Sequence, residues 1–177
     1  MSDRAASVGP STGRDAGEVA GEVGDSVGDG APRGLVLLLD GPNLNLLGQR
    51  EPEIYGATTL DEHVETVRRA AGELGLAVEH LQSNHEGEIV EAIHAARGRC
   101  AGIVINPGAF THYAWAIHDA LAAFAGPVVE VHLSNPQRRE SWRHTSVVSP
   151  VATGTISGLG GLGYVLAVKA VARLLDA

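Results

Sequence analysis

The unbroken aliphatic run at residues 35–39 leaves this chain few possible folds. A strand without polar alternation is typical of a parallel sheet that helices cover on both faces. Further strands are predicted at residues 77–81, 102–106, 127–131 and 151–156, and helices at residues 60–74, 86–97, 111–124 and 162–175. This alternation predicts an α/β fold: a flavodoxin-like three-layer sandwich with a five-stranded parallel sheet.

The helix predicted from Leu60 carries its own start signal. Thr59 stands at the N-cap position, and Glu62 can reach back to the Thr59 backbone, so the two residues form a capping box. Gly75 follows the last residue with helical spacing and predicts the end of the helix.

Residues 1–33 differ in composition from the rest of the chain. They contain no Leu, Ile, Phe, Tyr or Trp and are rich in Gly, Ala, Ser, Asp and Glu. Such a segment cannot bury enough apolar surface to offset the entropy lost when it is ordered. The sequence therefore predicts a disordered acidic tail at residues 1–33 and one flavodoxin-like domain at residues 34–177.

Charge and composition limit the partners of this chain. The net charge of −8 argues against a nucleic-acid surface, which needs a basic stripe, and against binding to an anionic membrane. No apolar run approaches the roughly 20 residues that span a bilayer, and the N-terminus lacks the apolar core of a signal peptide. The single cysteine, Cys100, excludes a disulfide framework and suits a reducing compartment. We expect a cytoplasmic protein that binds neither nucleic acid nor membranes.

Polar side chains gather after four of the predicted strands. Because ligands of open α/β sheets bind beyond the carboxyl ends of the strands, these residues predict a site at that edge. They are Asn43, Asn45, Gln49, Arg50 and Tyr55 after the first strand, residues 82–86 after the second, Asn106, Thr111 and His112 after the third, and Glu130, His132, Ser134, Asn135, Arg138, Arg139 and Arg143 at and after the fourth.

Two pairs within this set suggest acid–base chemistry. Glu130 and His132 are two apart on a strand, so both side chains leave the same face, and a carboxylate beside an imidazole makes a competent general acid. A structural pair at a strand end explains these two residues equally well. Arg50 and Tyr55 share one loop, where the guanidinium favours the phenolate and would let the tyrosine act as a base. Taken alone, this second pair is better explained by a surface tyrosine that anchors the loop.

The histidines show no metal-ligand spacing. His112 and His118 are six apart, His132 and His144 have no obvious third partner, and there is neither an H-E-x-x-H motif nor a cysteine pair. We therefore predict no metal site.

Two further features could have indicated a cofactor or an imine. Residues 158–163 match the glycine fingerprint of dinucleotide-binding proteins, but the sequence leaves no room for the second strand and the acidic residue that the fingerprint requires. Lys169 is the only lysine, and it lies within the last predicted helix, remote from the strand ends. The remaining tools are acid–base catalysis and electrostatics, so we predict a cofactor-free enzyme that removes water from a small carboxylate substrate.

Four separated motifs, in order, resemble the type II 3-dehydroquinate dehydratases. They are residues 39–56, 82–87, 105–112 and 130–135, and Arg139, Arg143, His144 and residues 158–164 also fit. The resemblance runs from about Leu35 to the C-terminus and omits only the tail. It implies a flavodoxin-like, cofactor-free lyase of the shikimate pathway, which leads to aromatic amino acids. Such an enzyme converts 3-dehydroquinate to 3-dehydroshikimate through an enolate and assembles as a dodecamer of trimers.

The motif match also implies roles for individual residues. Tyr55 would accept a proton, and His132, oriented by Glu130, would donate one. Arg50 would stabilise the transition state and the Tyr55 phenolate, and Asn43 would help to hold the water that stabilises the enolate. The residues implied in substrate binding are Asn106, His112, Asp119, Leu133, Ser134, Arg139 and Arg143, of which Asp119 is a candidate for reaching a neighbouring subunit's site.

Three positions depart from the family pattern, and none of them removes a catalytic group. Asp40 stands where an asparagine is expected, Tyr113 and Ala114 replace the commoner Thr-Ser, and Pro136 stands where an aliphatic residue is usual. The alternative function is a flavodoxin-like nucleotide- or phosphate-binding domain, which would need a Gly- or Ser/Thr-rich loop after the first strand. A structural assembly protein would leave both acid–base pairs unexplained.

Overall fold

The computed structural model describes residues 31–49 and 57–177. Its strands are β1 (Gly34–Asp40), β2 (Leu76–Gln82), β3 (Gly102–Asn106), β4 (Val128–His132) and β5 (Gly154–Ser157). They form one five-stranded parallel sheet in the order β2-β1-β3-β4-β5. This is the strand order of flavodoxin-like folds, so the predicted fold class is confirmed.

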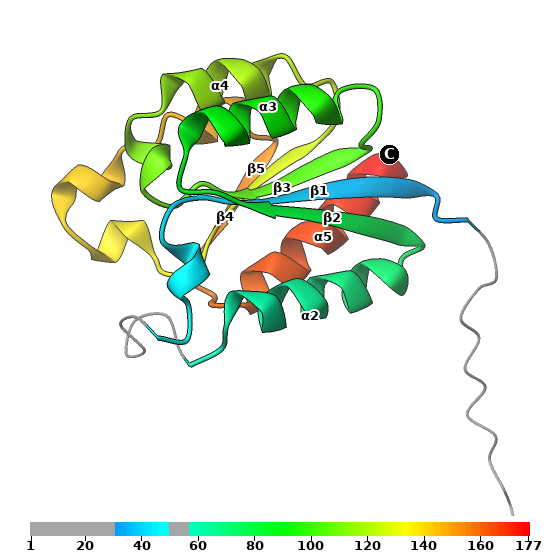
Figure 1. Ribbon diagram of the computed structural model, residues 1–177, viewed down its shortest axis with the longest axis horizontal. Helices are drawn as coiled ribbons and strands as arrows, with labels where there is room; N and C mark the ends of the chain where they lie inside the picture. Colours follow the sequence, from blue (N-terminus) through cyan, green and yellow to red (C-terminus); the bar gives the residue numbers. More distant parts are fainter. Residues whose placement is uncertain (1–30, 50–56) are drawn as a thin grey trace, which may run out of the picture.

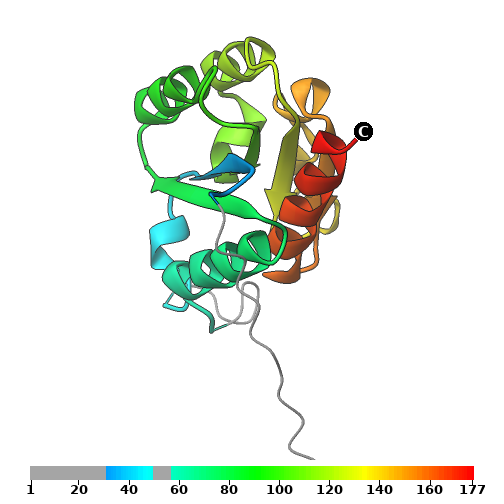
Figure 2. The same ribbon diagram turned by 90° about the vertical axis from the view of Figure 1, so that its right-hand side faces the viewer.

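Helices cover both faces of the sheet and make the three layers seen in Figures 1 and 2. One face is covered by α2 (Leu60–Gly72) and α5 (Leu162–Leu175), the other by α3 (Glu86–Ala96) and α4 (Trp115–Ala122). Successive β1 side chains alternate between these layers: Val36 and Leu38 pack with α2 and α5, whereas Leu37 and Leu39 pack with α3 and α4. Both faces of β1 are buried, which explains why its aliphatic run has no polar alternation.

The predicted capping box of α2 is confirmed. Glu62 N donates to Thr59 Oγ1 at 3.3 Å, and Thr59 N donates to Glu62 Oε2 at 2.8 Å. These bonds satisfy backbone donors that have no partner within the first helical turn. The helix ends at Gly72, and Gly75, with a φ of 70°, turns the chain toward β2.

Two predicted elements differ from the structure. The helix expected at residues 111–124 is a 3-10 helix, η2 (Gly108–His112), followed by α4. The two are separated at Ala114, whose ψ of 82° is not helical. The strand expected at residues 151–156 begins later, at Gly154, because Ser149–Val151 forms the 3-10 helix η5 with a proline in its first turn.

Arg33, the last residue of the predicted tail, contacts the folded domain. Its N donates to Gly75 O at 2.8 Å, and its Nε donates to Leu74 O at 2.9 Å. Residues 1–30 lie outside the described residues, so the disordered tail stays a prediction.

The carboxyl edge of the sheet is crowded where β1 and β3 end. Asp40 and Asn106 are register partners, and Gly41 N donates to Asn106 O at 2.8 Å. A Cβ at Gly41 would overlap the carbonyl oxygen of Pro107. The strand order reverses between β1 and β3, and ligands of open α/β sheets bind at such a point.

Gly41→Ala is expected to destabilise the fold by about 1–3 kcal/mol, because the added methyl group has no space unless the Pro107 backbone moves. Urea titration measures the change in the free energy of unfolding. Gly87→Ala in α3 is the matched control, since a Cβ there meets nothing within 4 Å. Helix propensity predicts that the control variant is slightly more stable than the parent. Equal losses of stability in both variants would contradict the close approach of the two loops.

Candidate active site

A pocket of about 80 Å³ lies at the carboxyl edge of the sheet. Its wall combines residues from the end of β3, from η2, from the end of β4 and from the segment that follows β4. Seven of the residues named from the sequence line it: Asn106, His112, His132, Leu133, Ser134, Arg139 and Arg143. The fold thus gathers at one place polar side chains that are far apart in the sequence.

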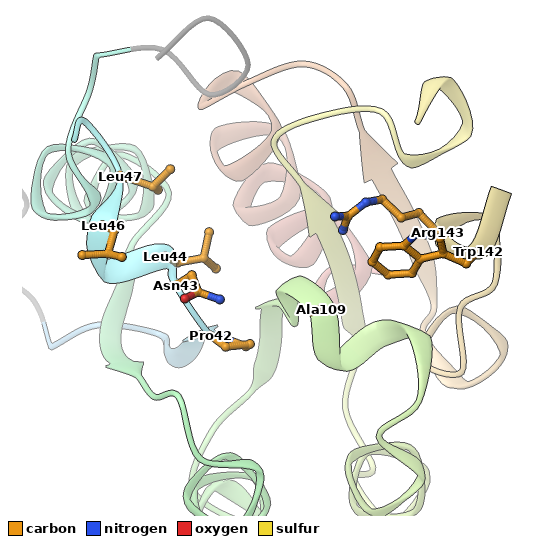
Figure 3. Close-up of a pocket in the computed structure, with 8 residues that line it drawn as sticks. All are labelled: Pro42, Asn43, Leu44, Leu46, Leu47, Ala109, Trp142 and Arg143. Atoms are coloured by element: carbon orange, nitrogen blue, oxygen red, sulfur yellow. The ribbon is translucent and has the colours of Figure 1, made fainter. Parts of the chain in front are cut away.

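A second pocket, of about 140 Å³, adjoins the first and shares Leu44, Ala109 and Arg143 with it. In Figure 3, Asn43 and the leucines of η1 (Leu44–Leu46) lie on one side of this pocket, and Trp142 and Arg143 lie on the other. Leu44 and Leu47 are buried in the core shared with α2 and α5, so η1 is firmly attached to the domain. The two pockets share a wall and together form one candidate site.

Asn43 is held at the wall of this site by the loop that follows β2. It adopts a left-handed conformation with a φ of 67°, which asparagine tolerates better than most residues. Its N donates to Asn84 Oδ1 at 2.8 Å. Gln82 Nε2 in turn donates to Asn84 Oδ1 at 3.3 Å and to Gly41 O at 3.2 Å. These bonds fix the position of the segment after β1.

Glu130 and His132 form the predicted pair at the end of β4. His132 Nε2 lies 2.8 Å from Glu130 Oε1, and Glu130 is fully buried. Glu130 also accepts hydrogen bonds from Thr111 Oγ1 at 2.6 Å, from Ser146 Oγ at 3.3 Å and from Ser149 Oγ. Burial alone would raise the pKa of Glu130, but the hydrogen bonds from His132, Ser149 and Thr111 outweigh it and hold the pKa below its usual value.

The charge on Glu130 determines the tautomer of His132. An ionised carboxylate can only accept, so His132 Nε2 carries the hydrogen of their bond. Nδ1 is then the ring nitrogen that is left to transfer a proton. When the ring also carries a proton on Nδ1, the pair is an oriented general acid beside the pocket that His132 lines.

Glu130→Gln is expected to cost about 1–3 kcal/mol of folding stability, because the new amide group would face donors that now bond to a carboxylate. The lowered pKa adds a pH dependence with a defined sign. The stabilisation from ionised Glu130 is fully present above the unfolded pKa, near 4.5, and is lost as the pH falls through the lower folded value. The gap in stability between parent and variant, measured by urea titration, should therefore narrow below about pH 4.5. A gap that stays constant down to pH 3 would contradict an ionised Glu130.

Trp142 holds two of the predicted substrate-binding residues. Its ring lies 4.0 Å from the Arg143 guanidinium and 5.1 Å from the His112 ring. Arg143 Nε also donates to Glu140 Oε2 at 2.8 Å. His112 Nδ1 lies 2.8 Å from Thr145 O, so Nδ1 donates and Nε2 is left for a ligand. The cation and the imidazole at the mouth of the site therefore have defined orientations.

The roles of three predicted residues, Arg50, Tyr55 and Asp119, stay predictions. Arg50 and Tyr55 lie outside the described residues, so their roles stay predictions. Asp119 is exposed on α4 and lines neither of the two pockets. Its assignment to a neighbouring subunit's site also stays a prediction.

The glycine turn at residues 158–163 is hydrogen-bonded to the end of β4, where His132 and Leu133 lie. Gly158 N donates to His132 O at 3.1 Å, and Gly160 N donates to Leu133 O at 3.0 Å. Both glycines have positive φ values, 81° and 55°, which a residue with a side chain rarely adopts. These N–H groups hold the end of β4, so the turn fixes the segment that carries His132 and Leu133.

The sequence placed Thr111 at the edge of the site without a role, and it did not single out Ser146, Ser149 or Trp142. Ser146 and Ser149 come from a stretch of 3-10 helices and turns, where no periodicity indicates which side chains face inward. A cluster of hydroxyl residues was the only available signal, and hydroxyl residues are common in every loop. Their contact with Glu130 depends on the tertiary fold alone.

Metal-ligand clusters, membrane-spanning helices and lysines at the two pockets are absent from the described part of the chain. Within residues 31–49 and 57–177, no three His, Cys, Asp or Glu side chains are grouped as metal ligands would be. Over the same ranges, no helix combines the length and the apolar character needed to cross a bilayer. Lys169 is exposed on α5 and lines neither pocket.

Comparison with known proteins gives a consistent result. The family model described as "Dehydroquinase class II" matches residues 34–172. The chain is 56% identical over 142 residues to "3-dehydroquinate dehydratase 2" of Pseudomonas putida, which covers 80% of this chain and 95% of that protein. It is 53% identical over 135 residues to "3-dehydroquinate dehydratase" of Halalkalibacterium halodurans, with 76% and 93% of the two chains covered.

A solved structure agrees with the sequence relatives. The crystal structure of type II dehydroquinase from Propionibacterium acnes superposes with a TM-score of 0.76 at 46% identity, and the match covers 79% of this chain and 97% of that one. With the family model spanning the domain and relatives more than half identical to it, the chain belongs to the class II dehydroquinase family.

Proposed function

We propose that this chain is a type II 3-dehydroquinate dehydratase, which dehydrates 3-dehydroquinate to 3-dehydroshikimate in the shikimate pathway. One geometric observation carries the proposal: a fully buried Glu130 orients His132 at the wall of a pocket that Asn106 and Arg143 also line. Removal of water requires an acid for the departing hydroxyl group, and an oriented imidazole supplies one. The relatives named as 3-dehydroquinate dehydratases support the choice of substrate.

The reaction is divided between two groups. Tyr55, with Arg50 favouring its phenolate, takes the proton from C2 beside the ketone and leaves an enolate. Asn43 helps to hold the water that stabilises the enolate. The enolate then reforms the ketone and expels the C1 hydroxyl group, which leaves as water with the proton from His132. The net change is the loss of one water molecule and the formation of a conjugated enone.

Substrate binding falls to the residues around the pocket. Arg143 and Arg139 supply positive charge for the substrate carboxylate and hydroxyl groups, although the chain as a whole is acidic. Leu133 and Ser134 follow the strand whose end the glycine turn holds, so their backbone offers fixed donors and acceptors. Asn106 and His112 contribute directional hydrogen bonds.

The quaternary state and location are also proposed from the resemblance. We expect a homododecamer built from trimers, in which Asp119 reaches a neighbouring subunit's site, and a cytoplasmic enzyme with a small-molecule substrate. An exposed aromatic side chain on α4, Trp115, suits burial against another copy. Light scattering of the purified protein measures the mass of the assembly.

An ultraviolet assay tests the proposed function directly. The product is a conjugated enone and the substrate is not, so absorbance should rise when the purified protein is added to 3-dehydroquinate. A flavodoxin-like nucleotide-binding domain would leave the absorbance unchanged, and it would instead be stabilised against heat by nucleotides.

Turnover is expected to continue unchanged in excess EDTA, because the proposed reaction uses side-chain acid–base groups alone. The same assay measures this, with a preparation incubated in buffer without EDTA as the control. Borohydride added together with substrate should leave the enzyme active, since Lys169 is the only lysine and is exposed on α5. A loss of turnover that a divalent ion restores, or a covalent adduct on Lys169, would contradict cofactor-free catalysis.

A further inference from the structure

A buried polar chain runs from β2 to the active-site pocket through Asp40. His80 Nε2 lies 2.9 Å from Asp40 Oδ2, and the Tyr164 hydroxyl donates to Asp40 Oδ1. Asn106 Nδ2 then donates to the Tyr164 hydroxyl oxygen at 2.8 Å. Asp40, Tyr164 and Asn106 are buried, with exposed fractions of 0%, 1% and 3%. Asn106 also lines the active-site pocket. Four side chains from three strands and α5 thus connect the interior to the site.

The direction of each hydrogen bond follows from the carboxylate at its centre. A carboxylate only accepts, so Tyr164 must donate its single hydrogen to Asp40. Burial, and then the charge of Asp40, raise the pKa of Tyr164 well above its usual value, so the hydroxyl keeps that hydrogen. The lone pairs of the Tyr164 oxygen are left for an incoming N–H, which Asn106 Nδ2 provides.

The carboxamide of Asn106 therefore has one favoured orientation. A rotation of 180° would bring Oδ1 against the Tyr164 oxygen, where neither atom could donate. In the observed orientation, Oδ1 also accepts from Gly108 N at 3.3 Å. The second hydrogen on Nδ2 remains for a molecule in the pocket.

We propose that Asp40 is a positioning residue for catalysis: acting through Tyr164, it fixes the direction in which the Asn106 carboxamide presents its donor to the substrate. This inference rests on the proposed function, in which Asn106 contacts 3-dehydroquinate. Asparagine at position 40 could turn either its oxygen or its amino group toward Tyr164, so it would leave both orientations of Asn106 open. Aspartate leaves only one.

His80 completes the arrangement at the second carboxylate oxygen. A buried charge destabilises a protein unless it is paired or hydrogen-bonded, and His80 and Tyr164 together supply a donor for each oxygen of Asp40. His80 lies on β2, two residues before Gln82, and Gln82 is the register partner of Asp40 on β1. The role of His80 is thus to keep Asp40 oriented toward Tyr164.

A mutant cycle on kcat/KM tests the inference. Asp40→Asn and Tyr164→Phe should each lower kcat/KM by about 3–10-fold, the usual effect of one lost or misdirected hydrogen bond. In an Asn106→Ala background the same substitutions should cause no further loss, because the group they position is gone. His80→Gln, which keeps a side-chain N–H donor, should retain more kcat/KM than His80→Leu. The inference is overturned if Asp40→Asn and Tyr164→Phe lower kcat/KM by the same factor in the Asn106→Ala background as in the parent. This holds whatever the melting temperatures of the variants are.

A neutron crystal structure of the parent protein provides a readout that does not depend on turnover. Deuterium on the Tyr164 oxygen should point to Asp40, and a deuterium on Asn106 Nδ2 should point to Tyr164. Deuterium on Tyr164 that points to Asn106 instead would overturn the inference. If the parent protein does not convert 3-dehydroquinate, the proposed function fails, and the neutron structure still decides whether Asp40 orients Asn106.

Discussion

His132→Ala should lower the rate of 3-dehydroshikimate formation by about 10²–10⁴-fold, the usual contribution of a general acid. The hydroxyl group at C1 is a poor leaving group unless it is protonated as it departs. Replacement of His132 removes the group that is proposed to supply this proton. The ultraviolet assay at saturating substrate measures kcat, which should carry most of the loss because the acid acts in the transition state.

The matched control for this variant is His94→Ala. His94 is exposed on α3 and lies on the opposite edge of the sheet, in a pocket that includes Arg97 and Cys100. Its replacement should leave kcat unchanged. A His132→Ala variant with near-parental kcat, or an equal loss in both variants, would mean that His132 is a structural partner of Glu130 only.

Tyr55→Phe is the second large effect, and it too should cost about 10²–10⁴-fold in kcat. Phenylalanine keeps the ring and removes the oxygen that is proposed to take the C2 proton. Arg50→Ala should also lower the rate and should shift its pH profile to higher pH, because the phenolate loses its neighbouring cation. The pH dependence of kcat for the parent and for Arg50→Ala measures this shift.

Tyr113→Phe is the matched control for the loss of a tyrosine hydroxyl. Tyr113 is exposed, and its ring packs edge-on against Phe110 at 6.1 Å, a contact that phenylalanine can keep. Parental turnover in this control together with a large loss in Tyr55→Phe supports the assignment of the base. A Tyr55→Phe variant that turns over normally would rule it out.

The sequence predicted the fold well because the relevant signals are local. The aliphatic run in β1 reports two covered faces, and the capping box at Thr59 and Glu62 fixes the start of α2. The parallel order of the strands then brings their carboxyl ends to one edge. For this reason the pocket contains Asn106 and His132, which were named from the sequence for their positions at strand ends.

The sequence was less informative where contacts join distant segments. Thr111 and Ser149 reach Glu130 from η2 and η5, and neither segment has the periodicity of a long helix or strand. The helix predicted at residues 111–124 was too long at its start for the same reason, since η2 turns Thr111 toward Glu130. The sequence marked Asp40 only as a departure from the family pattern and predicted no role for it. Its partner His80 lies 40 residues away, on another strand, and no local pattern connects the two.

Proton NMR of 3-dehydroquinate in deuterated buffer tests the division of labour between base and acid most directly. If Tyr55 removes the C2 proton and His132 protonates the leaving hydroxyl group, His132→Ala should still exchange the C2 proton for deuterium while forming little 3-dehydroshikimate. Tyr55→Phe should neither exchange that proton nor form product. Exchange that is abolished in His132→Ala but retained in Tyr55→Phe would contradict the mechanism and reverse the two roles.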